Sequence, residues 1–342
     1  MQVHYLDGQT DQWDEYVEQH ECGSVYQKSE WKKIIENHFG KKTFYIYVLD
    51  DNQIKGVLPL ILFKSKLFGT FIISVPYVNY GGMLYSDKEA EKLLKTEAEK
   101  IRKETDANFV ELRNLTDQHT GLKVKTQKVT FFLDLPDDEE ELFKSFKSKL
   151  RSQIRRPLKE EMYSKVGGIE LLDEYYSIFC RNMRDLGTPV YSKNFFKTIL
   201  EESPNNSNLV IVYTKEHKAV ASAFIIGSKE RMEIPWASTL REYNRLSPNM
   251  LLYWDILRFS ISKGYKQFDF GRCSKDSGTY KFKKQWGAIE QQLYWYYLLP
   301  EGEDLPEINP NNPKYKLAIS LWQKMPLFMT KIIGPHLVKN LP

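Results

Sequence analysis

Cysteine and histidine are scarce in this sequence. Among 342 residues there are three cysteines, Cys22, Cys180 and Cys273, far from one another, and six histidines that are likewise scattered along the chain. No C-x-x-C or H-x-x-x-H pair occurs, so the sequence indicates neither a disulfide framework nor a zinc site. We therefore expect a protein that holds no metal.

Long apolar runs are also absent. No stretch reaches the roughly 18 apolar residues that a membrane-spanning helix needs. The segment from Met1 to Thr10 lacks the basic and then apolar layout of a signal peptide. We expect a cytoplasmic protein, and a basic apolar C-terminal segment adds peripheral contact with the inner face of the membrane as an option.

The remaining composition is that of a soluble globular protein with room for two cores. The chain is 42% hydrophobic, 27% charged and 14% aromatic, with a net charge of +4. This mild charge does not by itself indicate a nucleic-acid-binding protein, although local clusters of lysine and arginine matter more than the total.

Two halves of the chain repeat one order of predicted elements: a β-meander, a helix and two further strands. In the first half these are residues 43–49, 54–62 and 71–75, the helix 87–105, and the strands 109–112 and 129–133. In the second half they are residues 208–213, 219–226 and 231–237, the helix 248–263, and the strands 267–270 and 291–298. We expect an α/β (α+β) protein with two tandem GNAT-like domains. Pro59 within a strand favours an edge position or a bulge.

The segment from Phe268 to Ala288 is typical of an anion-binding site. It reads F-D-F-G-R-C-S-K-D-S-G-T-Y-K-F-K-K-Q-W-G-A. A short strand ends at Gly271, a polar loop follows, and a predicted helix from Thr279 to Trp286 concentrates three lysines. Such a loop after a strand commonly holds anionic ligands in α/β proteins, which favours a transferase with a phosphate-bearing or acyl-bearing donor.

This segment carries a resemblance to a known family. The run from Tyr280 to Ala288 resembles the F-K-x-x-[FW]-G-A signature of FemABX-type peptidyltransferases, which have a tandem GNAT-like fold. The run from Asn182 to Tyr191, the F-D-F-G-R stretch and the final Leu-Pro resemble FemAB-like proteins of exosortase (XrtA/PEP-CTERM) and exopolysaccharide loci. The resemblance implies a first domain over 1–148, a second over 149–300 and a tail over 301–342 that packs on the first domain.

The resemblance also implies catalytic roles for Lys283 and Phe282. Lys283 would stabilise phosphate or developing oxyanion charge, and Phe282 would shape the channel wall. The alternative is an ordinary exposed helix lysine with Phe282 in the core. Lys281 and Tyr280, their neighbours in the motif, are assigned to substrate binding.

Three further residues are assigned to substrate binding. Arg272 follows a glycine at a strand end, where backbone can approach a ligand; an ion pair with Asp269 or Asp276 is the alternative. Arg184 would bind an anion of the acceptor or pair with Asp185 or Glu174. Trp236 would line the acceptor groove or lie in the core. Cys273 has no neighbouring histidine to activate it, which disfavours a nucleophilic role.

The donor is left open between aminoacyl-tRNA and acyl-CoA. Coenzyme-A-binding GNAT proteins place a glycine-rich turn before the central helix, so that backbone amides cradle the pyrophosphate. Here that stretch runs from Arg245 to Met250 without a glycine. Ser247 as N-cap and Pro248 in the first turn predict a helix, but a weakened pyrophosphate site. This modestly favours aminoacyl-tRNA.

Two charged segments allow two interpretations each. Residues 137–165 run from acid to base, and we expect one helix broken near Pro157. Its cations Lys149, Arg151, Arg155 and Arg156 either bind phosphates or form a solvated face. Lys314 to Pro342 has no acidic residue. It either lies on an anionic membrane or packs back on the protein.

We expect an N-acyltransferase or aminoacyltransferase that modifies an amino group on a nucleotide-linked or lipid-linked precursor of peptidoglycan, cell envelope or exopolysaccharide. Direct transfer to a bound amine needs no covalent intermediate, so positioning and charge stabilisation would dominate. Glu111 and Asp269 are options for a general base. The alternatives are a non-catalytic GNAT-like scaffold and, more weakly, an RNA-binding module.

Overall fold

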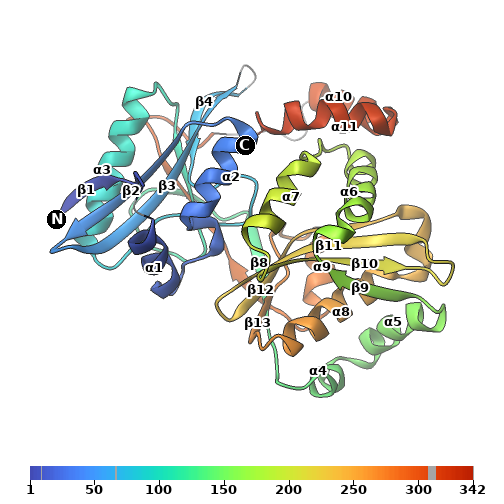
Figure 1. The fold of residues 1–342 in the computed structure, drawn as a ribbon. Coiled ribbons are helices and arrows are strands. Elements are labelled where there is room, and N and C mark those ends of the chain that lie inside the picture. Colours follow the sequence, from blue (N-terminus) through green and yellow to red (C-terminus); the bar gives the residue numbers. More distant parts are fainter. Residues whose placement is uncertain (9, 66–67, 307–312, 342) are drawn as a thin grey trace. The chain divides into compact units, whose positions relative to one another are not determined.

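The computed structural model describes residues 1–8, 10–65, 68–306 and 313–341, which form two compact units (Figure 1). The first unit contains residues 1–129 and 291–306, and the second contains residues 130–290 and 313–339. Each unit has its own β-sheet and its own covering helices. The tandem α/β architecture expected from the sequence is confirmed.

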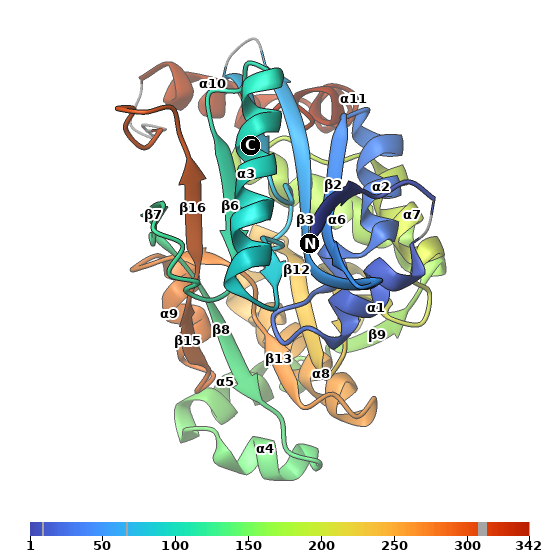
Figure 2. The ribbon, with the colours of Figure 1, turned by 90° about the vertical axis from the view of Figure 1, so that its left-hand side faces the viewer.

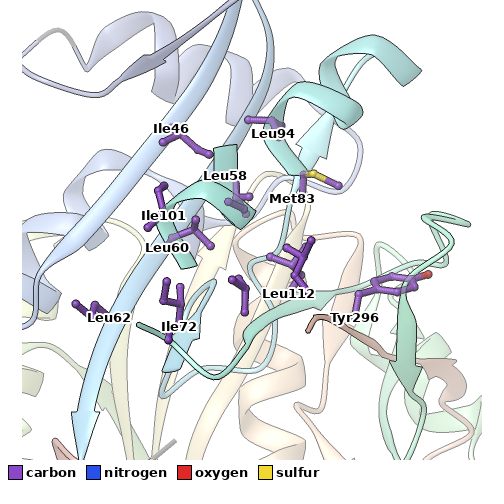
Figure 3. Close-up of a cluster of buried hydrophobic side chains, with 14 of the residues drawn as sticks. Ile46, Leu58, Leu60, Leu62, Ile72, Met83, Leu94, Ile101, Leu112 and Tyr296 are labelled. Atoms are coloured by element: carbon purple, nitrogen blue, oxygen red, sulfur yellow. The ribbon is translucent and has the colours of Figure 1, made fainter. Parts of the chain in front are cut away.

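The first unit is built on a mixed sheet in the order β1-β2-β3-β4-β6-β16-β7. Its strands are β1 (Gln2–Tyr5), β2 (Thr43–Asp50), β3 (Gln53–Ser65), β4 (Gly69–Ile73), β6 (Val110–Asn114), β7 (Lys123–Lys125) and β16 (Tyr294–Leu298), and the short β5 (Leu84–Tyr85) pairs with β3. The helix α3 (Lys88–Glu104) begins at Asp87, whose side chain accepts from the amides of Glu89 and Ala90. Figure 3 shows its apolar face buried against the sheet, with Leu94 and Ile101 facing Leu58 and Leu60.

Pro59 lies within β3 without breaking the sheet. It is opposite Tyr45 of β2, in a register where the next residue, Leu60, faces Phe44. On the other side of β3, β5 pairs only with Gly56 and Val57, and β4 pairs only from Ile61 onward. Pro59 therefore falls in the gap between two partner strands, where a missing N–H costs the ladder little.

The second unit repeats this plan. Its sheet has the order β14-β8-β13-β12-β11-β10-β9, and β15 (Ile289–Gln292) pairs with β8. The strands are β8 (Lys128–Asp134), β9 (Tyr163–Gly167), β10 (Ser207–Tyr213), β11 (Ala219–Ser228), β12 (Arg231–Thr239), β13 (Gln267–Asp269) and β14 (Cys273–Ser274). The helices α6 (Leu172–Leu186) and α7 (Lys193–Glu202) cover one face, and α8 (Pro248–Ser262) covers the other (Figure 1).

The closing strands of the two sheets are exchanged relative to the expected order. The strand from residue 129 was expected to close the first half and that from residue 291 the second. Instead β16 pairs with β6 in the first unit, and β8 pairs with β13 in the second (Figure 2). The units therefore differ from the domains expected at 1–148 and 149–300. Strand pattern alone could not reveal this, because both closing strands are apolar and similar in length.

The basic segment forms two helices rather than one. These are α4 (Glu139–Ser145) and α5 (Ser148–Lys159), so α5 ends two residues after Pro157, close to the expected break, and a further break at Phe146 was not predicted. The chain turns at Phe146, whose ring packs edge-on against Trp254 and Trp286. Burial of this side chain sets the break, while Pro157 lies in the last turn of α5.

The C-terminal helices α10 (Pro313–Lys324) and α11 (Leu327–Val338) both contact α6 of the second unit. The Trp322 indole N–H donates to the Thr188 carbonyl (3.1 Å), and Gly334 lies against Val190. The expectation that the tail packs on the first domain is therefore corrected. Within the described residues, no helix combines the length and apolar character that crossing a membrane would require.

Candidate functional site

The candidate site lies where two parallel strands of the second unit part. The strand β12 pairs with β13 only over Arg231–Glu233, opposite Gln267–Asp269. Beyond that point β12 continues to Thr239 beside β11, with an irregularity in the ladder after Glu233. The end of β13 thus leaves one edge of β12 without a partner strand in the described part of the chain, and the loop after β13 begins there.

That loop is anchored by a buried carboxylate. Asp269, at the end of β13, is fully buried and accepts hydrogen bonds from the Gly271 amide (2.8 Å) and from the Thr130 hydroxyl. Gly271 has a φ of +74°, a conformation that favours glycine over residues with a Cβ atom. Asp269 therefore fixes the turn that presents the Gly271 and Arg272 carbonyls.

Lys283 is directed into this turn. It belongs to α9 (Gly278–Lys284), is only 6% exposed, and donates to the Gly271 carbonyl (2.5 Å) and the Arg272 carbonyl (3.2 Å). Burial lowers the pKa of the Lys283 ammonium, and nearby Cys273 and Asp269 oppose this shift. This burial excludes the alternative that the sequence left open, in which Lys283 is an ordinary exposed lysine of a helix.

Phe282 and Tyr280 extend the site along α9. The Phe282 ring is half-buried and packs edge-on against Tyr253 of α8, with 4.9 Å between centroids. The Tyr280 hydroxyl donates to Glu290 (2.5 Å), and its ring meets Phe131. Both rings are therefore packed against neighbouring elements on either side of the helix turn that carries Lys283.

Arg272 and Lys281 differ in their surroundings. Arg272 is half-buried and close enough to Lys283 to add to the lowering of its pKa. Lys281, on the same helix, is exposed to solvent. Only Arg272 is therefore brought into the cluster around the Lys283 ammonium.

Arg184 and Trp236 have protein partners of their own. The Arg184 guanidinium pairs with Asp185 (2.7 Å), as the structural alternative proposed. Trp236 is 9% exposed and packs edge-on against Phe196 and Phe224. Its place in this aromatic core corrects the expected position in a groove wall, since the rings of α7 and β11 already cover it.

The structure adds residues to the site that sequence reasoning missed. Tyr253 of α8 supplies the face on which Phe282 packs, and Glu233, the last residue of β12 that pairs with β13, is close enough to raise the pKa of Lys283. Both come from other elements, and no local motif marks them. The sequence suggested Asp269 as a general base or as an ion-pair partner of Arg272, whereas its contacts assign it to anchoring the loop. No group of three His, Cys, Asp or Glu side chains among the described residues is placed to hold a metal.

The start of α8 offers little to a pyrophosphate. Ser247 occupies the expected N-cap position, but its φ is +59° and its side chain makes no capping hydrogen bond to α8. Pro248 has no N–H, and the Met250 amide donates to the Ser247 carbonyl (2.9 Å). Few amides of the first turn are left for an anion.

Comparisons with known proteins agree with this geometry. The family described as Acetyltransferase (GNAT) domain matches residues 144–284, from α4 to α9. The lipid II:glycine glycyltransferase of Staphylococcus haemolyticus (strain JCSC1435) is 28% identical over 411 aligned positions, covering 90% of this chain and 96% of the relative. The crystal structure of FemX superposes with a TM-score of 0.67 at 17% identity, covering 93% of this chain and all of that one. The chain therefore has the tandem GNAT-like fold of FemX and is similar to that protein over most of its length.

Another similar structure has the same fold. A tandem GNAT protein from the clavulanic acid biosynthesis pathway has a TM-score of 0.56 at 8% identity, covering 89% of this chain and 99% of that one. The GNAT match includes Lys283 and Phe282, so the enzyme class is that of an acyltransferase. The finer resemblance to exosortase-associated and exopolysaccharide proteins stays a prediction.

Proposed function

We propose that this protein transfers an aminoacyl group from aminoacyl-tRNA to an amino group of a lipid-linked peptidoglycan precursor. The observation that carries the proposal is the buried Lys283 ammonium at the point where β12 and β13 part. The acceptor class is suggested by the similarity to a lipid II:glycine glycyltransferase over 90% of this chain.

Lys283 supplies a donor for negative charge. An ammonium has three N–H groups, and two of them are engaged by the Gly271 and Arg272 carbonyls. The third is left for the oxyanion that forms when the acceptor amine attacks the ester carbonyl of the donor. The new C–N bond forms, the C–O ester bond breaks, and the amine proton ends on the departing hydroxyl. Arg272 beside it adds positive charge for a nearby phosphate.

The donor assignment gives the first prediction. Because the first turn of α8 offers few amides to a pyrophosphate, glycyl-tRNA with a lipid-linked precursor is expected to give aminoacylated product. Acyl-CoA with the same acceptor is expected to react at least about 100-fold more slowly. This is the size of effect expected when the protein lacks one strong contact, or two weaker ones, to the pyrophosphate of acyl-CoA. Mass spectrometry of the acceptor measures both rates, and comparable transfer from acyl-CoA would overturn the donor assignment.

Peripheral contact with the membrane is part of the proposal. The helices α10 and α11 expose Leu317, Leu321, Phe328 and Ile332, each about 60% accessible, where soluble surfaces seldom gather apolar side chains. Lys316 and Lys324 are exposed on the same helices, and the described residues after 312 include no acid. A basic apolar surface of this kind suits an anionic bilayer that also holds a lipid-linked acceptor.

This surface gives the second prediction. The double change Phe328→Ser and Ile332→Ser is expected to lower binding to mixed phosphatidylglycerol and phosphatidylcholine vesicles at least about tenfold, since each side chain would lose apolar burial in the bilayer. Ile289→Ser, at an equally exposed apolar position on β15, is the matched control and should bind like the wild type. Cosedimentation measures the binding, and equal effects of the two changes would contradict the assignment to α10 and α11.

A further inference from the structure

A cavity of about 430 Å³ lies in the second unit between the start of α5 and the end of α9. Three lysines line it, Lys147 and Lys149 from the α5 side and Lys284 from α9, and no carboxylate is among its lining residues. In the described part of the chain none of the three has an acidic partner within ion-pair distance. The cavity therefore concentrates uncompensated positive charge.

The start of α5 increases this charge. Lys147 stands at the N-cap position without a side-chain cap, and no acidic residue lies in the first turn. A helix N-terminus carries partial positive charge and unsatisfied amides, so lysines at this position are unfavourable without an anion. The opposite arrangement is found at α4, which begins with Asp138 as a cap and three glutamates. The start of α5 therefore lacks the acidic residues that stabilise the start of α4. Local departures of this kind are common at functional sites.

Two neutral groups of the lining also lack partners. The Trp286 side chain is fully buried, and the described residues offer no acceptor to its indole N–H. The Oε1 atom of Gln153 is buried and receives no hydrogen bond from the described residues. A ligand that satisfies both must offer an acceptor to the indole N–H and a donor to the Gln153 oxygen, and a phosphate next to a ribose hydroxyl offers the two together.

We propose that this cavity binds a phosphate–ribose unit of the RNA part of the donor. The phosphate oxygens accept from the lysines, the first amides of α5 and the Trp286 N–H, and a ribose 2′-hydroxyl donates to Gln153. The inference rests on the proposed function and assigns the donor's binding site. Since Lys283 faces the loop after β13 while Lys284 lines the cavity, α9 couples donor binding to the reacting group.

The test measures binding of uncharged tRNA by fluorescence anisotropy between about 50 and 200 mM salt. The triple variant Lys147→Gln, Lys149→Gln and Lys284→Gln should bind at least tenfold more weakly, with a salt slope smaller by about 1, because one bound phosphate loses the lysines that neutralise it. The matched control changes Lys197, Lys215 and Lys263 to glutamine, three exposed lysines of the same unit. Equal affinities of the two triple variants would overturn the assignment of the cavity.

A second measurement separates the ribose from the phosphate. The wild type should bind a single-stranded RNA several-fold more tightly than DNA of the same sequence, and Gln153→Leu should remove most of that preference. Equal binding of RNA and DNA by the wild type would overturn the hydroxyl contact. If the wild type transfers from aminoacyl-tRNA but the lysine variant keeps its affinity, only the cavity is wrong. If the wild type transfers from acyl-CoA and binds no RNA, the proposed donor fails as well.

Discussion

Replacing Lys283 with alanine is expected to lower the rate of aminoacyl transfer about 10²–10³-fold, the effect of removing one oxyanion donor. The ammonium is held by two backbone carbonyls and has one N–H left for the reacting oxygen, so no neighbouring lysine can substitute for it. Lys281→Ala, an exposed change on the same helix, is the matched control and should transfer normally. Single-turnover rates at saturating donor, with circular dichroism to confirm folding, measure the effect.

The pH dependence gives an independent check on Lys283. Burial lowers its pKa from 10.5, so between the folded pKa and 10.5 the unfolded chain binds more protons than the folded one. The burial penalty is therefore fully present below the folded pKa and is relieved as pH rises towards 10.5. Transfer needs the ammonium and should fall over the same interval. The variant Lys283→Arg stays charged, so its transfer rate should no longer fall at alkaline pH. If the rate still falls as in the wild type, another group causes the alkaline decrease.

Replacing Asp269 with alanine is expected to lower the free energy of unfolding by about 2–5 kcal/mol, because two buried donors lose their acceptor. These are the Gly271 amide and the Thr130 hydroxyl, both bound to the same carboxylate oxygen. Asp269→Asn keeps an oxygen that can accept both bonds and should lose much less. Urea unfolding measures the change.

Asp134→Ala provides the control for Asp269. Asp134 lies on the neighbouring strand, is exposed, and accepts one bond from Gln267, so its loss should cost about 0.5 kcal/mol or less. Below its melting temperature Asp269→Ala should also transfer slowly, since the turn that holds Lys283 is no longer fixed. If Asp269→Ala unfolds like Asp134→Ala, the loop is anchored by other contacts.

The order of strands and helices could be predicted from the sequence because hydrophobic period and turn residues are local signals. The motif at Tyr280 to Ala288 likewise pointed to Lys283. Its burial could not be predicted, since the carbonyls that receive it come from a loop that only the tertiary fold brings to α9. Tyr253 and Glu233 were missed for the same reason.

Some errors came from local rules that packing overrides. Pro157 lies in the last turn of α5, as its helix-breaking character favours, but the helix pattern of the segment gave no sign of the earlier turn at Phe146, where an aromatic ring is buried. Trp236 matched an expected groove position, but an aromatic core of four neighbouring rings encloses it. Whether a large aromatic side chain lines a groove or is buried in a core depends on its neighbours in the folded protein, and the sequence does not show which residues those are.

The exchange of β8 and β16 bears on how the chain matures on the ribosome. The strand β6 is made early, but its partner β16 ends at Leu298, so nascent chains expose the β6 edge until nearly the whole protein has been synthesised. An unpaired edge next to an apolar core is prone to aggregate, which makes this protein a natural client for chaperones during translation. The sheet whose strands leave the ribosome first is therefore the sheet that is completed last.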